Sequence, residues 1–324
     1  MYKKTDCRIV CLSVLICLMA CISSCSNKKL TTLKPSGYEQ VKSIVAETGD
    51  LKATFVENSE LKPYHRMGYN GIAELYHTEQ DSTAFVPDYA GFNLEHIFSG
   101  DSLVQYFEPR INPMTLYKKS NTEILLYQGL TPVSGVESLT EFKIVPPNYI
   151  DIKFTCILHD LSYFKHDYAG FFWASYINNP PDKNIYFKGI HEESSSDTWI
   201  PVYSEKHGIK STHPGINDHN DFYFAPDFNA TLANNFSDYR FKEPYYFGHF
   251  HNMILAFFFE SPEVIRFSQS PTGGGNNNPA WDFQFLIPKP VTNKMYSFKS
   301  RMVYKPFVSN HDIEQEYQYW SKNN

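Results

Sequence analysis

Short apolar runs rich in aromatic residues constrain this 324-residue chain more than any other feature. It contains 26 Phe, 23 Tyr and 4 Trp. Most of these lie in alternating or continuous apolar runs, separated by residues typical of turns, which is the pattern of β-strands. The runs are 71–78, 123–128, 149–158, 170–177, 184–187, 221–224, 245–259, 264–268, 280–287 and 295–307. Many successive strands with few helical stretches between them predict an antiparallel sandwich or barrel.

Two pairs of runs are predicted to form hairpins, because residues that favour turns lie between them. Ser120-Asn121 separates residues 114–119 from 122–128. Pro146-Pro147-Asn148 separates residues 142–145 from 149–158. Asn, Ser and Pro each favour the backbone angles of tight turns.

Only the two ends of the chain have helical patterns. Ser36-Gly37-Tyr38-Glu39 has capping-box spacing and precedes Val41, Ile44, Val45 and Thr48, which predicts a helix over about 36–48. Ile313, Tyr317 and Trp320 recur at helical spacing and predict a second helix over about 310–322. The expected fold class is therefore all-β, a large antiparallel β-sandwich with short helices at both ends. Because no linker divides residues 25–324, we expect one domain there.

The first residues resemble an export signal. Lys3, Lys4 and Arg8 precede an uncharged apolar run over 9–20, which is too short to span a bilayer. The run ends in Ile22-Ser23-Ser24-Cys25, which resembles the bacterial lipobox, so residues 1–24 are expected to be a lipoprotein signal peptide and Cys25 the lipidation site. The alternative is an ordinary secretory signal cleaved nearby. Ser26 follows without an acidic cluster, which by resemblance to sorting signals favours the periplasmic face of the outer membrane.

Cysteine usage agrees with export of a chain without disulfides. Five of the six cysteines fall within residues 1–25, and only Cys156 remains. Cys156 alternates with apolar residues in the run 149–158, so we interpret it as a small buried side chain.

The net charge of the chain and the pattern of its glycines argue against nucleic acid, phosphate-loop and dinucleotide ligands. Without residues 1–24 the chain keeps 26 basic and 34 acidic residues, a net charge near −8. Nucleic acid binding is therefore not expected, because it requires a positive surface, and polyanionic glycans are disfavoured less strongly. The run Gly273-Gly274-Gly275 lacks the Gly-Lys-Ser/Thr ending of a phosphate loop and the βαβ unit of a dinucleotide site. The sequence identifies no cofactor.

The stretch 268–285 places three glycines and three asparagines between two predicted strands. Such a connection is either a mobile tip or functional, and the polar and aromatic residues beside it suit sugar recognition. A similar mixture recurs over 171–183. Although aromatic residues of β proteins are more often core than platform, these segments predict a sugar-binding cleft. Its candidate residues are Trp173, Tyr176, Asn178, Arg266, Gly274, Asn278, Trp281, Asp282 and Gln284.

Ionisable residues form a third set of candidates. Glu95 and His96 are expected to point to opposite faces of an extended strand, while His249 and His251 are expected to share one. The histidine pair could bind a metal with a further ligand, serve as an acid/base pair, or be structural; we assign no metal site. The candidate catalytic residues are His96, Glu108, Arg110, His249 and His251, with Glu95 as an alternative carboxylate and Arg266 as an alternative arginine.

The length, the nearly all-β pattern, the export signal and the scattered His, Glu and Arg residues resemble the galactose mutarotase-like supersandwich. This is the fold of aldose 1-epimerases and of domains in several polysaccharide lyases and glycoside hydrolases. The resemblance covers roughly residues 50–308, and Glu108-Pro109-Arg110 and Gly248-His249-Phe250-His251-Asn252 are similar to epimerase segments. It implies a His and a Glu acting as acid and base on a sugar ring. Two hypotheses follow: a carbohydrate-active lipoprotein (epimerase, lyase or hydrolase type), or a glycan-binding lipoprotein without chemistry.

Overall fold

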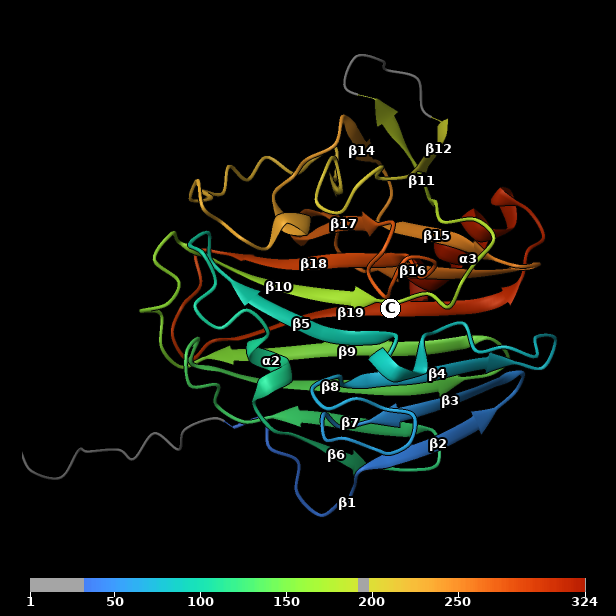
Figure 1. The fold of residues 1–324 in the computed structure, drawn as a ribbon, viewed down its shortest axis with the longest axis horizontal. Coiled ribbons are helices and arrows are strands. Elements are labelled where there is room, and N and C mark those ends of the chain that lie inside the picture. Colours follow the sequence, from blue (N-terminus) through green and yellow to red (C-terminus); the bar gives the residue numbers. More distant parts are fainter. Residues whose placement is uncertain (1–31, 192–197, 324) are drawn as a thin grey trace, which may run out of the picture. The chain divides into compact units, whose positions relative to one another are not determined.

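A computed structural model describes residues 32–191 and 198–323, in which two antiparallel sheets lie face to face (Figure 1). The first sheet, sheet A, has 11 strands among the described residues. In spatial order they are β1 (Glu39–Val41), β6 (Met114–Lys118), β7 (Glu123–Gln128), β8 (Val136–Val145), β9 (Tyr149–Leu158), β19 (Met295–Pro306), β16 (Met253–Phe259), β15 (Tyr245–Phe250), β11 (Ile185–His191) and β12 (Thr198–Val202), with β14 (Tyr239–Phe241) paired to β11. The expected sandwich is confirmed.

The second sheet, sheet B, has eight strands in the same part of the chain. Their order is β13 (Thr212–Pro214), β17 (Ile265–Ser270), β18 (Ala280–Pro288), β10 (Tyr168–Ser175), β5 (Phe92–Phe98), β4 (Gly71–His77), β3 (Leu51–Val56) and β2 (Ser43–Thr48). Short helices lie between strands: η1 (Pro87–Tyr89), α2 (Glu108–Ile111), η2 (Thr231–Ala233) and η3 (Pro262–Val264).

The core lies between the sheets and is strongly aromatic. Phe92 of sheet B stacks on Phe257 of sheet A with ring centres 5.6 Å apart. Trp173 of sheet B contacts Phe154 of sheet A at 5.4 Å. Because inward and outward side chains alternate along each strand, the run pattern of the sequence places these rings inside. Cys156 is also fully buried there, as expected.

The predicted C-terminal helix is confirmed as α3 (Asn310–Asn323). Ile313, Tyr317 and Trp320 are its buried residues, and they pack on the outer face of sheet A against Phe258 and Val303. Both predicted hairpins, β6–β7 and β8–β9, are also present. Among the described residues no helix is long and apolar enough to cross a membrane.

The predicted helix over 36–48 is wrong, because this segment forms β1 and β2. β2 pairs with β3 in a hairpin closed at Gly49, whose φ of 60° is left-handed. Val41, Ile44 and Val45 are β-branched, a side-chain type that favours strands. Pairing with a neighbouring strand therefore outweighed the capping-box spacing.

The strand predicted over 221–224 is also absent. These residues belong to a segment over 215–235, here called the roof segment, that lies on the outer face of sheet B. Phe222 stacks on Tyr168 at 4.3 Å, and the Leu232 carbonyl accepts hydrogen bonds from Ser268 and Gln284 at 2.9 and 3.2 Å. The aromatic residues of 221–224 thus pack on a sheet instead of pairing within one.

Candidate functional site

A β-bulge in β5 places two consecutive polar residues on one face of sheet B. His96 pairs with Phe172, and Leu94 pairs with Trp173, so Glu95 is the extra residue. Leu94 and Ile97 both point into the core between the sheets. Glu95 and His96 therefore both project from the outer face of sheet B, and the expectation of opposite faces is wrong.

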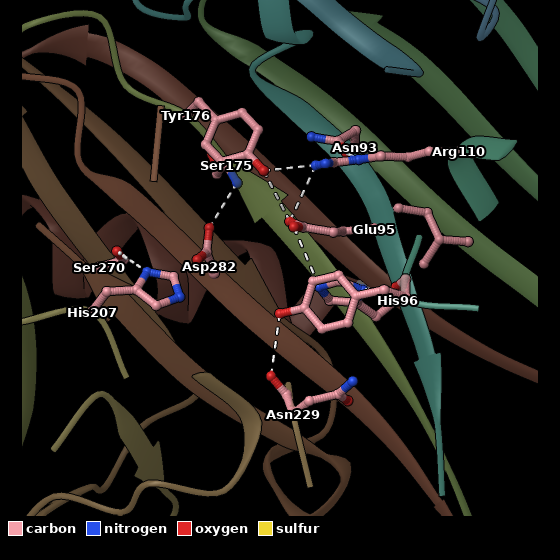
Figure 2. A network of polar contacts seen from close by, with 12 residues as sticks. Asn93, Glu95, His96, Arg110, Ser175, Tyr176, His207, Asn229, Ser270 and Asp282 are labelled. Atoms are coloured by element: carbon pink, nitrogen blue, oxygen red, sulfur yellow. Dashed lines mark hydrogen bonds and ion pairs between the residues drawn. The ribbon is translucent and has the colours of Figure 1, made fainter. Parts of the chain in front are cut away.

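The Glu95 carboxylate is the centre of this network (Figure 2). Its Oε1 lies 3.3 Å from His96 Nε2, and its Oε2 lies 3.2 Å from Arg110 Nη2. Tyr176 Oη donates a hydrogen bond to Oε2 at 3.0 Å. Burial acts to raise the pKa of the Glu95 carboxyl, but Arg110, His96 and the hydrogen bonds outweigh it and lower the pKa to about 2. Glu95 is therefore a permanent negative charge at neutral pH.

His96 is held on both sides by acceptors. Its Nδ1 contacts the carbonyl oxygen of Tyr106, and its Nε2 faces the Glu95 carboxylate. The ring of Phe107 stacks on the imidazole at 5.0 Å. Each ring nitrogen of His96 therefore faces a protein oxygen.

A small cavity of about 30 Å³ lies against Glu95 and His96. Tyr106, Phe172, His207, Ala230 and Leu232 complete its lining. Nδ1 of His207 contacts Ser270 Oγ at 3.0 Å, and its Nε2 has no partner among the described residues. Partial burial lowers the pKa of the His207 imidazole, so this histidine is a neutral proton acceptor at pH 7. The cavity has room for one or two water molecules.

Asp282 adds a carboxyl group of opposite character on the same sheet face. It is 1% exposed, and its Oδ1 accepts a hydrogen bond from the Ser175 backbone N–H at 2.8 Å. Its Oδ2 is buried without a partner among the described residues. Burial, followed by the charge of Glu95, raises the pKa of Asp282 well above its usual value. Two neighbouring carboxyl groups with opposite pKa shifts are typical of functional sites.

Among the predicted site residues, His96, Arg110, Tyr176 and Asp282 come together here. Arg110 Nε donates to Asn93 Oδ1 at 2.9 Å and its Nη2 donates to Tyr176 Oη at 2.6 Å. Glu95, the alternative carboxylate of the sequence, takes the place of Glu108. Glu108 is buried elsewhere, where its Oε1 accepts the backbone N–H of Val133 at 2.7 Å. Its predicted catalytic position is therefore wrong.

The two predicted tryptophan platforms are wrong as well. Trp173 and Trp281 are 0% exposed and belong to the core between the sheets. The Trp281 indole N–H donates to the Lys183 carbonyl at 3.1 Å, and its ring packs against Gly248, where a Cβ would lie 2.3 Å from it. A core position in a β protein explains both residues better than sugar stacking.

The glycine and asparagine stretch forms an ordered turn between β17 and β18. Gly274 N–H donates to the Asn278 carbonyl at 2.9 Å, and Asn278 Oδ1 accepts the Asn179 N–H at 2.9 Å. A Cβ on Gly274 would lie 3.2 Å from Tyr176 Cβ. Asn178 instead donates to the Thr83 carbonyl at 3.1 Å. These residues lie outside the cavity lining, and the turn supports Tyr176 from the side.

Arg266 and Gln284 belong to a second polar cluster on the same face. Arg266 Nε donates to Asp218 Oδ2 at 2.6 Å, and Gln284 Nε2 donates to Ser268 Oγ at 3.2 Å. Through Asp218 and Leu232 they hold the roof segment. They anchor the roof of the cavity and do not line it.

The predicted histidine pair is separated from the site. β15 ends at Phe250, and His251 is an exposed turn residue with a φ of 57°. His249 lies on the outer face of sheet A against Phe307, with ring centres 4.7 Å apart. Because the strand ends between them, the two histidines do not share a strand face. No group of three or more His, Cys, Asp or Glu in the described residues could hold a metal ion.

Sequence reasoning missed His207 and Tyr106. His207 lies in a loop without periodicity, and only the tertiary structure brings it to the cavity. Tyr106-Phe107 directly precede Glu108-Pro109-Arg110, and this aromatic pair beside a candidate arginine was the available signal.

Comparison with protein-family models and with curated proteins finds no match. Among solved structures, the chain is similar to an aldose 1-epimerase candidate from Escherichia coli K12, with 8% identity, a TM-score of 0.48, and coverage of 83% of this chain and 100% of that one. It is similar to 4-alpha-glucanotransferase from Thermococcus litoralis, with 9% identity, a TM-score of 0.44, and coverage of 84% of this chain and 40% of that one. It is also similar to heparan sulfate lyase HepC from Pedobacter heparinus, with 11% identity, a TM-score of 0.39, and coverage of 86% of this chain and 37% of that one. The chain thus spans less than half of the latter two proteins. At TM-scores below 0.5 these likenesses describe layout and carry nothing about activity.

Proposed function

We propose that this protein is a lipid-anchored periplasmic protein that performs acid/base chemistry on a sugar at the Glu95–His96 site. The observation that carries the proposal is the convergence of an imidazole, a guanidinium and a phenol on one carboxylate that is only 12% exposed, with a second histidine across a cavity. Ion pairs buried only for stability gain little, because removing two charges from water offsets their attraction. A network of this kind is therefore a candidate for chemistry.

The two histidines have complementary roles. His96 Nε2 donates a proton to a sugar oxygen that replaces its 3.3 Å contact with Glu95 Oε1, and His207 Nε2 accepts a proton from a sugar hydroxyl. Protonation of the ring oxygen together with deprotonation of the anomeric hydroxyl opens a pyranose to its aldehyde. Closure on the other face, with both protons returned, interconverts the anomers. This epimerase-type reaction requires only these two transfers.

The test is the rate of anomer interconversion of freshly dissolved α-glucose and α-galactose, followed by polarimetry with the purified protein. We expect a rate above that of buffer, and a loss of about 100-fold or more in Glu95→Gln, His96→Gln and His207→Gln. His249→Gln, a partly buried histidine on the other sheet, is the matched control and keeps the rate. Because the pKa of His207 is lowered, the acidic limb of the kcat/KM profile should lie below pH 6.5 and disappear in His207→Gln.

A second candidate function is glycan binding without chemistry. The cavity of about 30 Å³ is too small for a sugar ring unless the roof segment or side chains move, whereas binding without chemistry does not require a sugar to reach Glu95 and His96. Calorimetric binding of a sugar without any rate above buffer would support this candidate and overturn the catalytic one. The absence of both binding and turnover across a panel of sugars would exclude both.

A further inference from the structure

One nitrogen of the Arg110 guanidinium is not engaged by another described residue. The Arg110 side chain is 6% exposed, and Nε and Nη2 are engaged by Asn93, Tyr176 and Glu95. Nη1 has no partner among the described residues. The guanidinium lies 4.2 Å from the ring centre of Tyr69 and 4.8 Å from that of Phe107, so two aromatic rings fix its plane.

A groove of about 370 Å³ lies beside this arginine. It is lined by Met67, Gly68, Tyr69, Phe107, Arg110 and Ile111. The volume is within the range of about 300–1,000 Å³ typical of small-molecule sites. Met67 and Ile111 are 75% and 61% exposed, so the rim is open and apolar. Arg110 is the single charged residue of the lining.

Asn93 engages Nε, and Glu95 and Tyr176 engage Nη2, so Nη1 is the guanidinium nitrogen left for an acceptor that enters from the groove.

We propose that this groove binds a sugar bearing one carboxylate, such as a hexuronate, with Arg110 Nη1 donating to that carboxylate between the rings of Tyr69 and Phe107. Arg110 also contacts Glu95 through Nη2, so a carboxylate bound at Nη1 from the groove would lie beside the Glu95 network. The inference rests on the proposed function in taking the ligand to be a carbohydrate.

The apolar rim explains why a single acidic group suits this groove. A polyanionic chain would need several cations along its path, and Arg110 stands alone between Met67 and Ile111. A sugar face packs well on Tyr69 or Phe107, because C–H groups contact aromatic rings favourably. The groove therefore matches one charged sugar unit and not a run of them.

The experiment is calorimetric titration with glucuronate and galacturonate, their methyl esters, and glucose and galactose. We expect the acids to bind about tenfold or more tightly than the esters, which is about 1.4 kcal/mol. Ile111→Asp, at an exposed rim position beside Arg110, should remove most of that preference. Val104→Asp, at a position 84% exposed and outside the groove lining, is the matched control and should keep the preference.

Arg110→Lys tests the guanidinium itself. We expect it to lose the acid preference, while Arg266→Lys, another buried and paired arginine, keeps the ratio even if both variants melt at lower temperature. If the wild type binds acids and esters equally, or if Ile111→Asp has no effect, this inference is overturned. The proposed function would still stand in that case, provided that sugar binding is sensitive to Glu95→Gln. If no sugar of the panel binds, both fail.

Discussion

Glu95 and Asp282 are two carboxyl groups on one sheet face whose pKa values are shifted in opposite directions. Glu95 is surrounded by donors and positive charges, whereas Asp282 has one backbone donor and the negative charge of Glu95 nearby. Protonation state is thus set by the partners that each group finds in the fold. Neither state follows from the identity of the residue.

The lowered pKa of Glu95 stabilises the fold only at pH values at which the carboxylate is also ionised in the unfolded chain. Its contribution is present above the unfolded pKa of about 4.5 and is lost as the pH falls towards 2. For Asp282 the sign is reversed, because its pKa is raised. The contribution of Asp282 to the free energy of unfolding is fully present below about pH 3.8 and is lost as the pH rises.

Asp282→Asn should therefore stabilise the protein increasingly from pH 4 to pH 8. The asparagine amide keeps an oxygen for the Ser175 N–H, has a shape close to the protonated acid, and cannot ionise. The measurement is the difference in melting temperature between variant and wild type across this range. A difference that stays constant or falls with pH would show that Asp282 is ionised in the native state.

The sequence indicated which residue types could belong to a site, but it did not indicate which residues lie next to them in the fold. His96 and Arg110 were identified as candidates because they are ionisable, and Tyr176 because it is an aromatic residue beside a polar turn. Trp173 and Trp281 had the same aromatic signal as Tyr176, and both are core. Sequence pattern does not report which face of a strand an aromatic residue occupies once a bulge or a bend changes the alternation.

At the scale of elements, the bulge in β5 is the decisive feature that the sequence did not indicate. Two polar residues in succession, Glu95 and His96, read as one inward and one outward side chain under strict alternation. The extra residue places both outward and sets the 3.3 Å contact between them. By contrast, strands β7, β9 and β18 could be predicted closely, because their apolar runs are bounded by turn residues.

The roof segment also depends on tertiary contacts. Its main anchor is the pair Asp218–Arg266, whose side chains are 2% and 3% exposed. Phe222 and Phe236 lie about equally far from the guanidinium, at 5.1 and 5.0 Å. Phe222, which resembled part of a strand in the sequence, therefore packs here against a buried ion pair.

Asp218→Asn should leave Arg266 as an uncompensated buried charge and cost about 3–5 kcal/mol of the free energy of unfolding. The loss should be accompanied by faster amide hydrogen exchange over residues 215–235. Asp151→Asn is the matched control, since the Asp151–Arg301 pair is partly exposed and should cost about 1 kcal/mol or less. Equal losses in the two variants would mean that the roof segment is held mainly by its apolar contacts.

At the scale of the whole molecule, the sandwich could be predicted from the aromatic composition and from the alternation of apolar and polar residues, because both indicate which side chains are buried. Aromatic side chains such as Phe92, Phe154 and Phe257 bury large areas, and hydrophobic burial is the dominant favourable term in folding. The order of strands in each sheet could not be predicted in this way. β9 pairs with β19, about 140 residues away in the chain, and no local pattern encodes that partner.

The last prediction concerns the first 25 residues, which lie outside the described part of the structure. If Cys25 carries lipid, replacing residues 1–25 by the cleavable signal of a soluble periplasmic protein should move the chain from the membrane to the soluble periplasmic fraction. Metabolic labelling with radioactive palmitate should mark the wild type and be lost in Cys25→Ala.

Cys156→Ala is the matched control for this experiment. Cys156 is the other cysteine that remains after residue 24, and it is buried in β9, where burial raises the pKa of its thiol and keeps it unreactive. This variant should stay labelled and membrane-bound. If the chain with the exchanged signal still sediments with membranes, its attachment arises from the folded domain and the lipid anchor is not what holds it there.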